Sequence, residues 1–215
     1  MQSLNELKKI HKTALIITAH PDDESLFMGG TIAEFKKWNW RILCVTDCDE
    51  RYNMRRRTEL LRACGIYKRH GSRIEPFMLG VTRWRHRFDK AEIAGKIKDF
   101  LHLAQRPGVV FTHNKTGEYG HNTHRLIHSA VNEMGISNVY TFSYGESGAQ
   151  RRDMDLVRLS DRSLFAKREA ISLYLKGSQK TNLSRLRYIV DSAFNADTEV
   201  FHRPKWHYTT NIIPI

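Results

Sequence analysis

Short apolar runs alternate with longer segments of helical spacing over the first 145 residues. The run TALIITA, for example, is short and rich in β-branched residues, which is typical of a buried strand. Strands are expected at residues 13–19, 41–46, 74–78, 109–112 and 138–142. Helices are expected at residues 31–38, 52–64, 89–105 and 121–134, the second of them ended by Gly65. Strands separated by such helices predict a Rossmann-like three-layer α/β/α fold with a mostly parallel sheet.

The pattern changes after about residue 150. Helices are expected at residues 163–175 and 183–190, and the aromatic-rich tail from Glu199 is expected to be extended. We interpret residues 1–215 as a single domain. Its core would span about residues 13–145, and a small helical and extended C-terminal appendage would span about residues 150–215.

The composition narrows the class of protein. Hydrophobic residues make up 40% of the chain and charged residues 27%, which is a globular balance. No apolar run approaches the roughly 20 residues that a membrane-spanning helix needs. The first residues lack the apolar segment of a secretory signal, and the three cysteines include no CxxC pair. We therefore expect a cytoplasmic protein without a membrane span.

Positive charge is concentrated in one part of the chain. Residues 51–87 hold eleven Lys or Arg residues against two acidic ones, a surplus of nine within a net charge of +12. Such a segment favours an anionic partner, such as phosphate, nucleic acid or acidic lipid, but a solvated basic face has the same composition. Aromatic residues lie among the basic ones, as a base-stacking surface would need: Tyr52, Tyr67, Phe77, Trp84 and Phe88.

Two segments rich in titratable side chains follow expected strands. The first is HPDDE at residues 20–24, and the second runs from His113 and Asn114 to GEYGHNTH at residues 117–124. Ligands bind at the carboxyl ends of strands in such sheets, so we expect both segments at one site. His20, one aspartate and one of the last two histidines form a donor set that suits catalytic zinc. The leftover aspartate and histidine would act as base and acid beside a metal-activated water.

Each segment alone also has an ordinary structural explanation. Aspartate at the start of a helix satisfies free N–H groups, and histidines three residues apart are common on exposed helices. A dinucleotide site is not expected, because no GxGxxG follows the first strand and the two carboxylates there would repel a pyrophosphate.

Together the two segments resemble those of the PIG-L/LmbE family of zinc-dependent de-N-acetylases. AHPDDE and, about 100 residues later, GEYGHxxH carry the resemblance. It extends over roughly residues 13–180 and includes GGTIAEF, VTD, RRTELLRAC, VVFTHN and LYLKGSQ. The resemblance implies an LmbE-like fold and one Zn²⁺ per chain, bound by His20, Asp23 and His124.

The resemblance also implies roles for other residues. Asp22 matches the general base, His121 the residue that acts as acid or stabilises developing charge, and Tyr119 a tyrosine that hydrogen-bonds the oxyanion. The substrate-binding positions that it implies are Arg56, His113 and Asn114.

The chain departs from the family pattern in two places. HNTH stands at residues 121–124 where the family commonly has HPDH, so an aspartate that could support a ligand histidine is missing. The segment ACGIY at residues 63–67 also differs from the usual A-x-x-x-LG.

The implied activity is a metal-dependent hydrolysis that removes an N-acetyl group from an amino-sugar substrate. The basic segment indicates that this substrate is anionic or linked to a carrier. Two alternatives remain open: deacylation of an amide linked to a nucleotide or nucleic acid, and nucleic-acid binding with a non-catalytic zinc site. The sequence also leaves open whether the chain forms homo-oligomers.

Overall fold

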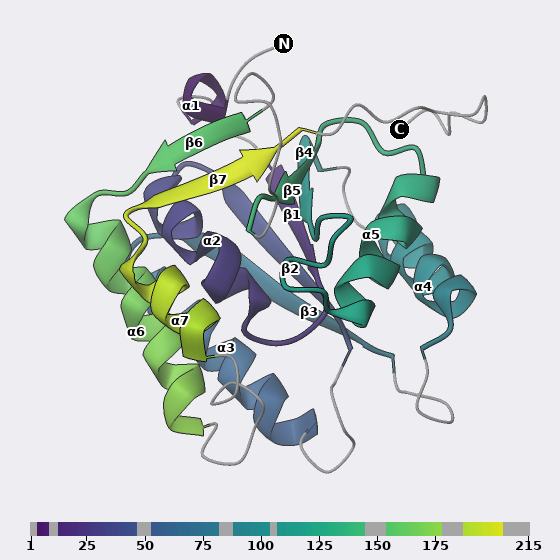
Figure 1. Cartoon of the computed structure of the whole chain (residues 1–215), viewed down its shortest axis with the longest axis horizontal. Coiled ribbons are helices and arrows are strands. Elements are labelled where there is room, and N and C mark those ends of the chain that lie inside the picture. The colour runs from purple at the N-terminus through teal and green to yellow at the C-terminus, as the bar shows by residue number, and fades with distance from the viewer. Residues whose placement is uncertain are drawn as a thin grey trace.

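The computed structural model describes residues 4–8, 13–46, 53–81, 88–103, 107–144, 154–177 and 187–203. Within these ranges a seven-stranded sheet has the strand order β3-β2-β1-β4-β5-β7-β6 (Figure 1). The strands are β1 (Thr13–Thr18), β2 (Asn39–Thr46), β3 (Arg73–Val81), β4 (Val109–Thr112), β5 (Val139–Phe142), β6 (Met154–Arg158) and β7 (Thr198–His202). The first five strands pair in parallel, whereas β7 pairs antiparallel with both β5 and β6. The predicted α/β fold with a mostly parallel sheet is confirmed.

Helices cover both faces of this sheet. They are α1 (Leu4–Leu7), α2 (Asp23–Glu34), α3 (Asn53–Arg69), α4 (Lys90–Leu103), α5 (Asn122–Glu133), α6 (Asp161–Gly177) and α7 (Arg187–Asn195). Helices α4 and α5 lie on one side of the sheet, and α2, α3, α6 and α7 lie on the other (Figure 1). Among the helices in the described ranges, none is both long and apolar enough to cross a bilayer.

Strand β1 is buried on both faces. Ala14 and Ile16 belong to the hydrophobic core under α2 and α6, whereas Leu15 and Ile17 belong to the core under α4 and α5. Alternate residues of a strand point to opposite faces, so a central strand of a covered sheet is apolar throughout. This explains why the continuous run at residues 13–19 predicts the strand correctly.

The boundaries of α2 and α3 differ from the prediction for reasons that the structure shows. Helix α2 begins at Asp23 rather than Thr31 and ends at Glu34 rather than Trp38. Its end was misplaced because Phe35 and Trp38 are fully buried and extend the apolar pattern past the last helical turn. Helix α3 runs through Gly65 to Arg69, because a single interior glycine weakens a helix by only about 1 kcal/mol.

The C-terminal elements do more than cover the sheet. They add β7 and β6 to its edge beyond β5. Strand β6 is absent from the prediction, and its half-exposed, weakly alternating residues explain why. Helix α6 contains the helix predicted at residues 163–175. Helix α7 overlaps the helix predicted at residues 183–190 only from Arg187 and runs on to Asn195, and residues 183–186 lie outside the described residues. Strand β7 begins the extended tail. The tail beyond residue 203 lies outside the described residues.

Glu34 joins α2 to α6 and to the N-terminal segment. Its carboxylate accepts hydrogen bonds from Lys8 Nζ at 2.5 Å, from Ser160 N at 3.1 Å and from Ser163 Oγ at 2.6 Å. Partial burial acts to raise the pKa of Glu34, but these hydrogen bonds outweigh it and lower the pKa from 4.5 to about 2. The ionised carboxylate therefore stabilises the folded chain.

We expect Glu34→Gln to lower the free energy of unfolding by about 1.5–3 kcal/mol at pH 7, the usual range for hydrogen bonds to a charged group. The folded pKa lies below the unfolded one, so the stabilisation is complete above pH 4.5 and is lost as the pH falls toward 2. Thermal unfolding from pH 7 to about 3 measures the difference, with Glu92→Gln on α4 as the control. A difference between wild type and Glu34→Gln that stays constant over this range would contradict the assignment.

Candidate metal centre

The pairing of β1 with β4 brings the two polar segments together at one end of the sheet. Ile17 of β1 lies opposite Thr112 of β4, so the chain that follows each strand leaves at the same place. A direct hydrogen bond joins the two segments, because Ala19 N–H donates to His113 Nε2 at 2.9 Å. The structure therefore places both segments at one site, as expected.

His20, Asp23 and His124 converge at this site. His124 Nε2 lies 3.4 Å from His20 Nδ1 and 3.4 Å from Asp23 Oδ1. His20 Nδ1 lies 3.5 Å from Asp23 Oδ2. Asp23 is the first residue of α2 and His124 lies in the first turn of α5; both are buried, whereas His20 is partly exposed. The structure thus brings together the three residues predicted to bind zinc.

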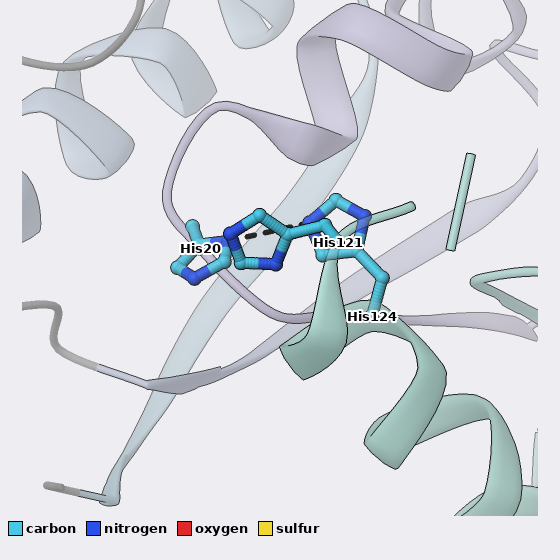
Figure 2. Close-up of side chains that lie close together, drawn as sticks. All are labelled: His20, His121 and His124. Carbon is cyan, nitrogen blue, oxygen red and sulfur yellow. Dashed lines mark hydrogen bonds between the residues drawn. The ribbon is translucent and has the colours of Figure 1, made fainter. Parts of the chain in front are cut away.

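His121 lies beside this trio. Figure 2 shows the rings of His20, His121 and His124 close together where α5 begins. One ring nitrogen from each of the three lies within 4.8 Å of the others. His121 Nδ1 is buried and has no hydrogen-bond partner among the described residues. Buried polar atoms are normally paired, so an orphaned histidine nitrogen in this cluster fits a site that binds an ion or a substrate.

A second group of potential ligands shares His124 and is fully buried. It consists of Asp23, His113 and His124, and its donor atoms also lie within 4.8 Å of one another. Both groups offer imidazole nitrogen, and the second adds a carboxylate oxygen, which are donors that zinc accepts. The described residues at this end of the sheet therefore fit a metal of this type.

The two neighbouring aspartates have opposite pKa shifts. Burial acts to raise the pKa of Asp23, but its interactions with His124, His113 and His20 outweigh burial and hold the pKa well below its ordinary value. Burial raises the pKa of Asp22 to about 8, although Arg56 acts in the opposite direction. Asp23 is therefore ionised and suited to a cation, whereas Asp22 is suited to exchange a proton near neutral pH.

Arg56 binds Asp22. Its Nη2 donates to Asp22 Oδ2 at 2.5 Å and to the Pro21 carbonyl, and its Nη1 donates to Glu59 Oε2 at 2.6 Å. Asp22 has a φ of 130°, a strained conformation for a residue other than glycine, and these contacts help to hold it. With 5% of its surface exposed, Arg56 orients Asp22 in this structure, which does not support its prediction as a substrate contact.

His113 and Asn114 are fully buried behind the site. The Asn114 amide donates to the carbonyls of Phe142 and Tyr144, and its oxygen accepts from Thr116 and from the backbone N–H of Glu118. These side chains hold the loop that precedes α5. Their burial does not support the prediction that they contact substrate.

Tyr119 stands next to the histidines, as its predicted role requires. Its ring centroid lies 5.6 Å from that of His121 and 5.4 Å from that of His124. Burial, followed by the nearby carboxylates of Asp23 and Asp22, raises the pKa of Tyr119 above its usual value. The phenol therefore stays protonated and can donate a hydrogen bond.

Glu118 is a site residue that the sequence does not predict. This buried carboxylate contacts both His113 Nδ1 and His124 Nδ1 through Oε2, at 2.9 Å and 2.6 Å. The available signal was an acidic residue inside the GEYGHNTH motif of a chain that lacks the aspartate of HPDH. The resemblance implies roles for the histidines and the tyrosine of this motif, but not for Glu118.

Part of the basic segment lies on α3. Arg57, Arg62 and Lys68 are exposed there, whereas Arg55 and Arg69 pair with Glu59 and Glu169. Arg51, Arg83, Arg85 and Arg87 lie outside the described residues, as do Tyr52 and Trp84. Tyr67 is fully buried and its hydroxyl bonds Ser25, so it does not offer the stacking face considered for nucleic acid.

Fold and site together define an α/β protein with a cluster of imidazole and carboxylate donors at the carboxyl end of its central strands. The PIG-L family model, described as GlcNAc-PI de-N-acetylase, matches residues 15–135, more than half of the chain. The chain therefore belongs to the PIG-L family, and the resemblance found in the motifs is confirmed.

Curated relatives include two proteins named 1D-myo-inositol 2-acetamido-2-deoxy-alpha-D-glucopyranoside deacetylase. The one from Gordonia bronchialis is 30% identical over 155 residues, which cover 54% of this chain and 54% of the relative. The one from Actinosynnema mirum is 28% identical over 190 residues, covering 68% and 65%. The alignments thus span between about half and two thirds of the length of these relatives.

Solved structures support the fold. N,N'-diacetylchitobiose deacetylase from Pyrococcus horikoshii matches with a TM-score of 0.69 and 18% identity, covering 94% of this chain and 86% of that one. The A40926 pseudoaglycone deacetylase Dbv21 matches with a TM-score of 0.65 and 16% identity, covering 91% and 98%. The hydratase GalB of Pseudomonas putida shares the fold with a TM-score of 0.54 and 17% identity, covering 93% and 99%.

We expect His20→Ala, Asp23→Ala and His124→Ala each to lower the metal content of the purified protein from about one zinc-type ion per chain, because each removes a donor from a three-residue set. His102→Ala, an exposed histidine on α4, is the matched control and should keep the wild-type content. Elemental analysis of the folded variants measures the effect. Full metal content in all three site variants would show that the donors have been misassigned.

Proposed function

We propose that the protein is a metal-dependent amide hydrolase that removes an N-acetyl group from an amino-sugar substrate, with one Zn²⁺ per chain. The observation that carries the proposal is the convergence of His20, Asp23 and His124 beside Asp22 in a member of the PIG-L family. The curated relatives named as deacetylases of an acetamido sugar support the choice of reaction and of substrate class.

In the proposed site, His20, Asp23 and His124 would hold the metal. When bound, Zn²⁺ supplies Lewis-acid chemistry, which lowers the pKa of a water molecule and polarises the amide carbonyl. Asp22 lies directly before the ligand Asp23 and would accept the proton of the attacking water. The hydroxyl of Tyr119 would donate a hydrogen bond to the oxyanion of the tetrahedral intermediate.

The leaving amine needs a proton. Burial, reinforced by His20 and His124, lowers the pKa of His121 to about 3, so its imidazole is neutral at pH 7. Asp22, with a pKa near 8, is better suited both to take the proton from water and to return it to the nitrogen. We therefore assign His121 to stabilising the charge that develops beside it, and assign proton return to Asp22.

We expect Asp22→Asn to keep the metal but to lower turnover by about 10²-fold or more, since general base catalysis contributes about 10²–10⁴. The asparagine keeps the size of the side chain but cannot accept the proton. Amine release from an N-acetylglucosamine derivative and metal content are measured on the same sample, with Asp191→Asn, an exposed position on α7, as control. Loss of the metal instead of turnover would show that the roles of Asp22 and Asp23 have been exchanged.

We also propose that the amino-sugar substrate is anionic. Helix α3 joins the site through Arg56, which binds Asp22, and exposes Arg57 and Arg62 on its surface. A phosphate or diphosphate on the substrate would be attracted by this charge, whereas a neutral sugar would gain little. The cytoplasmic location stays a prediction. The oligomeric state stays open.

We expect kcat/KM for a phosphorylated N-acetylglucosamine derivative to exceed that for a neutral one, and the gap to shrink as salt screens the charges. The double variant Arg57→Glu/Arg62→Glu should lower kcat/KM for the phosphorylated compound by about tenfold at low salt and leave the neutral compound unchanged. Lys96→Glu/Lys98→Glu, on α4 across the sheet, is the charge-matched control. Equal rates for both compounds at every salt concentration would contradict an anionic substrate.

A further inference from the structure

A single buried carboxylate oxygen connects two histidines of the site. Glu118 Oε2 lies 2.6 Å from His124 Nδ1 and 2.9 Å from His113 Nδ1. Its other oxygen, Oε1, accepts the backbone N–H of Asn114 at 2.9 Å. The Glu118 side chain is completely buried. Each group that it contacts can donate a hydrogen bond to its ionised carboxylate.

The backbone is strained in order to place this carboxylate. Glu118 has a φ of 58°, in the left-handed region, which costs a residue other than glycine about 1 kcal/mol or more. Gly117 and Gly120 on either side of Glu118–Tyr119 have φ values of 71° and 88°. Such strain persists only where surrounding contacts hold it, and it clusters at functional sites.

The short contact fixes the tautomer of His124. A carboxylate can only accept, so His124 Nδ1 carries the hydrogen that it donates to Glu118. His124 Nε2 then has a free lone pair, directed toward His20 Nδ1 and Asp23 Oδ1 at 3.4 Å each. The opposite tautomer would place a hydrogen where a cation is expected.

His113 supports the same arrangement from behind. Its Nδ1 faces Glu118, and its Nε2 accepts the Ala19 N–H at 2.9 Å, so both ring nitrogens are engaged. Its ring stacks on that of His124 with centroids 3.8 Å apart. Because both ring nitrogens of His113 already have protein partners, His113 is not counted among the proposed ligands, which stay His20, Asp23 and His124.

We propose that Glu118 is a positioning residue for the metal centre: by accepting the Nδ1 hydrogen of His124, it fixes the ring and presents Nε2 to the metal. It supplies the carboxylate that this chain lacks at Thr123, the position of the aspartate in HPDH. The inference rests on the proposed function, because it requires a metal at this site. Outer carboxylates of this kind typically change metal affinity by about 10–100-fold.

The test is a titration of chelator-treated protein with Zn²⁺ against a chromophoric competitor, for wild type, Glu118→Gln and Glu199→Gln. In Glu118→Gln the side-chain amide keeps an acceptor for Asn114 N–H but no longer requires Nδ1 of His124 to carry the hydrogen. Glu199 is also buried, but it bonds Lys167 and the backbone of α2 rather than a histidine. We expect a Zn²⁺ affinity about 10–100-fold weaker in Glu118→Gln and unchanged in folded Glu199→Gln.

Several outcomes would overturn the inference. An affinity of Glu118→Gln within about twofold of wild type would exclude a positioning role, where 10–100-fold is expected. An equal loss in Glu199→Gln would show that removal of any buried carboxylate weakens the site. Failure of wild type to bind Zn²⁺ would contradict the proposed function itself, which separates the two failures.

A measurement on the wild-type apoprotein does not depend on the variant folding. Histidine ¹⁵N spectra distinguish the two neutral tautomers, and His124→Gln identifies the signal of His124. We expect the Nδ1–H tautomer for His124 near neutral pH. The Nε2–H tautomer would contradict the proposal.

Discussion

The parallel pairing of β1 with β4 brings together the two segments that carry all the candidate functional side chains except Arg56. It places the ends of two strands side by side, although residues from the two segments, such as Ala19 and His113, are far apart in the chain. Because β1 is buried on both faces, any shift of its register by one residue would exchange the residues of the two cores. The geometry of the site is therefore fixed by the centre of the sheet.

Burial of so many ionisable groups requires that nearly every one has a partner. Asp22 is compensated by Arg56, Glu118 by His113 and His124, and Asp23 accepts the backbone N–H of His20 at 2.8 Å. An isolated buried charge is very unfavourable, so this network holds only as a whole. Within it, His121 Nδ1 is buried without a hydrogen-bond partner among the described residues, and the His121 ring lies next to those of His20 and His124.

Local patterns in the sequence were sufficient to predict the parallel core of the sheet and the grouping of its two polar segments. Buried strands such as β1 are continuous apolar runs, and parallel strands direct their carboxyl ends to one edge. Strand β6 could not be predicted in this way, because it is a half-exposed edge strand whose position depends on pairing with β7.

At the site, too, the sequence predicts some features and not others. The motifs predicted which residues meet, but not which of them are buried, since burial depends on packing between distant elements. Arg56, His113 and Asn114 were expected to contact substrate, yet each is enclosed by contacts with other protein groups. Glu118 is not predicted, because its contacts with His113 and His124 depend on a left-handed turn that sequence spacing alone does not reveal.

The most direct test of the account is amine release from an N-acetylglucosamine derivative by protein that has been stripped of metal and then reconstituted. We expect that stripping abolishes activity and that about one equivalent of Zn²⁺ per chain restores it, as a single catalytic centre requires. Activity that persists after the metal is removed would contradict the assignment of the site. So would a failure of Zn²⁺ to restore activity to the reconstituted protein.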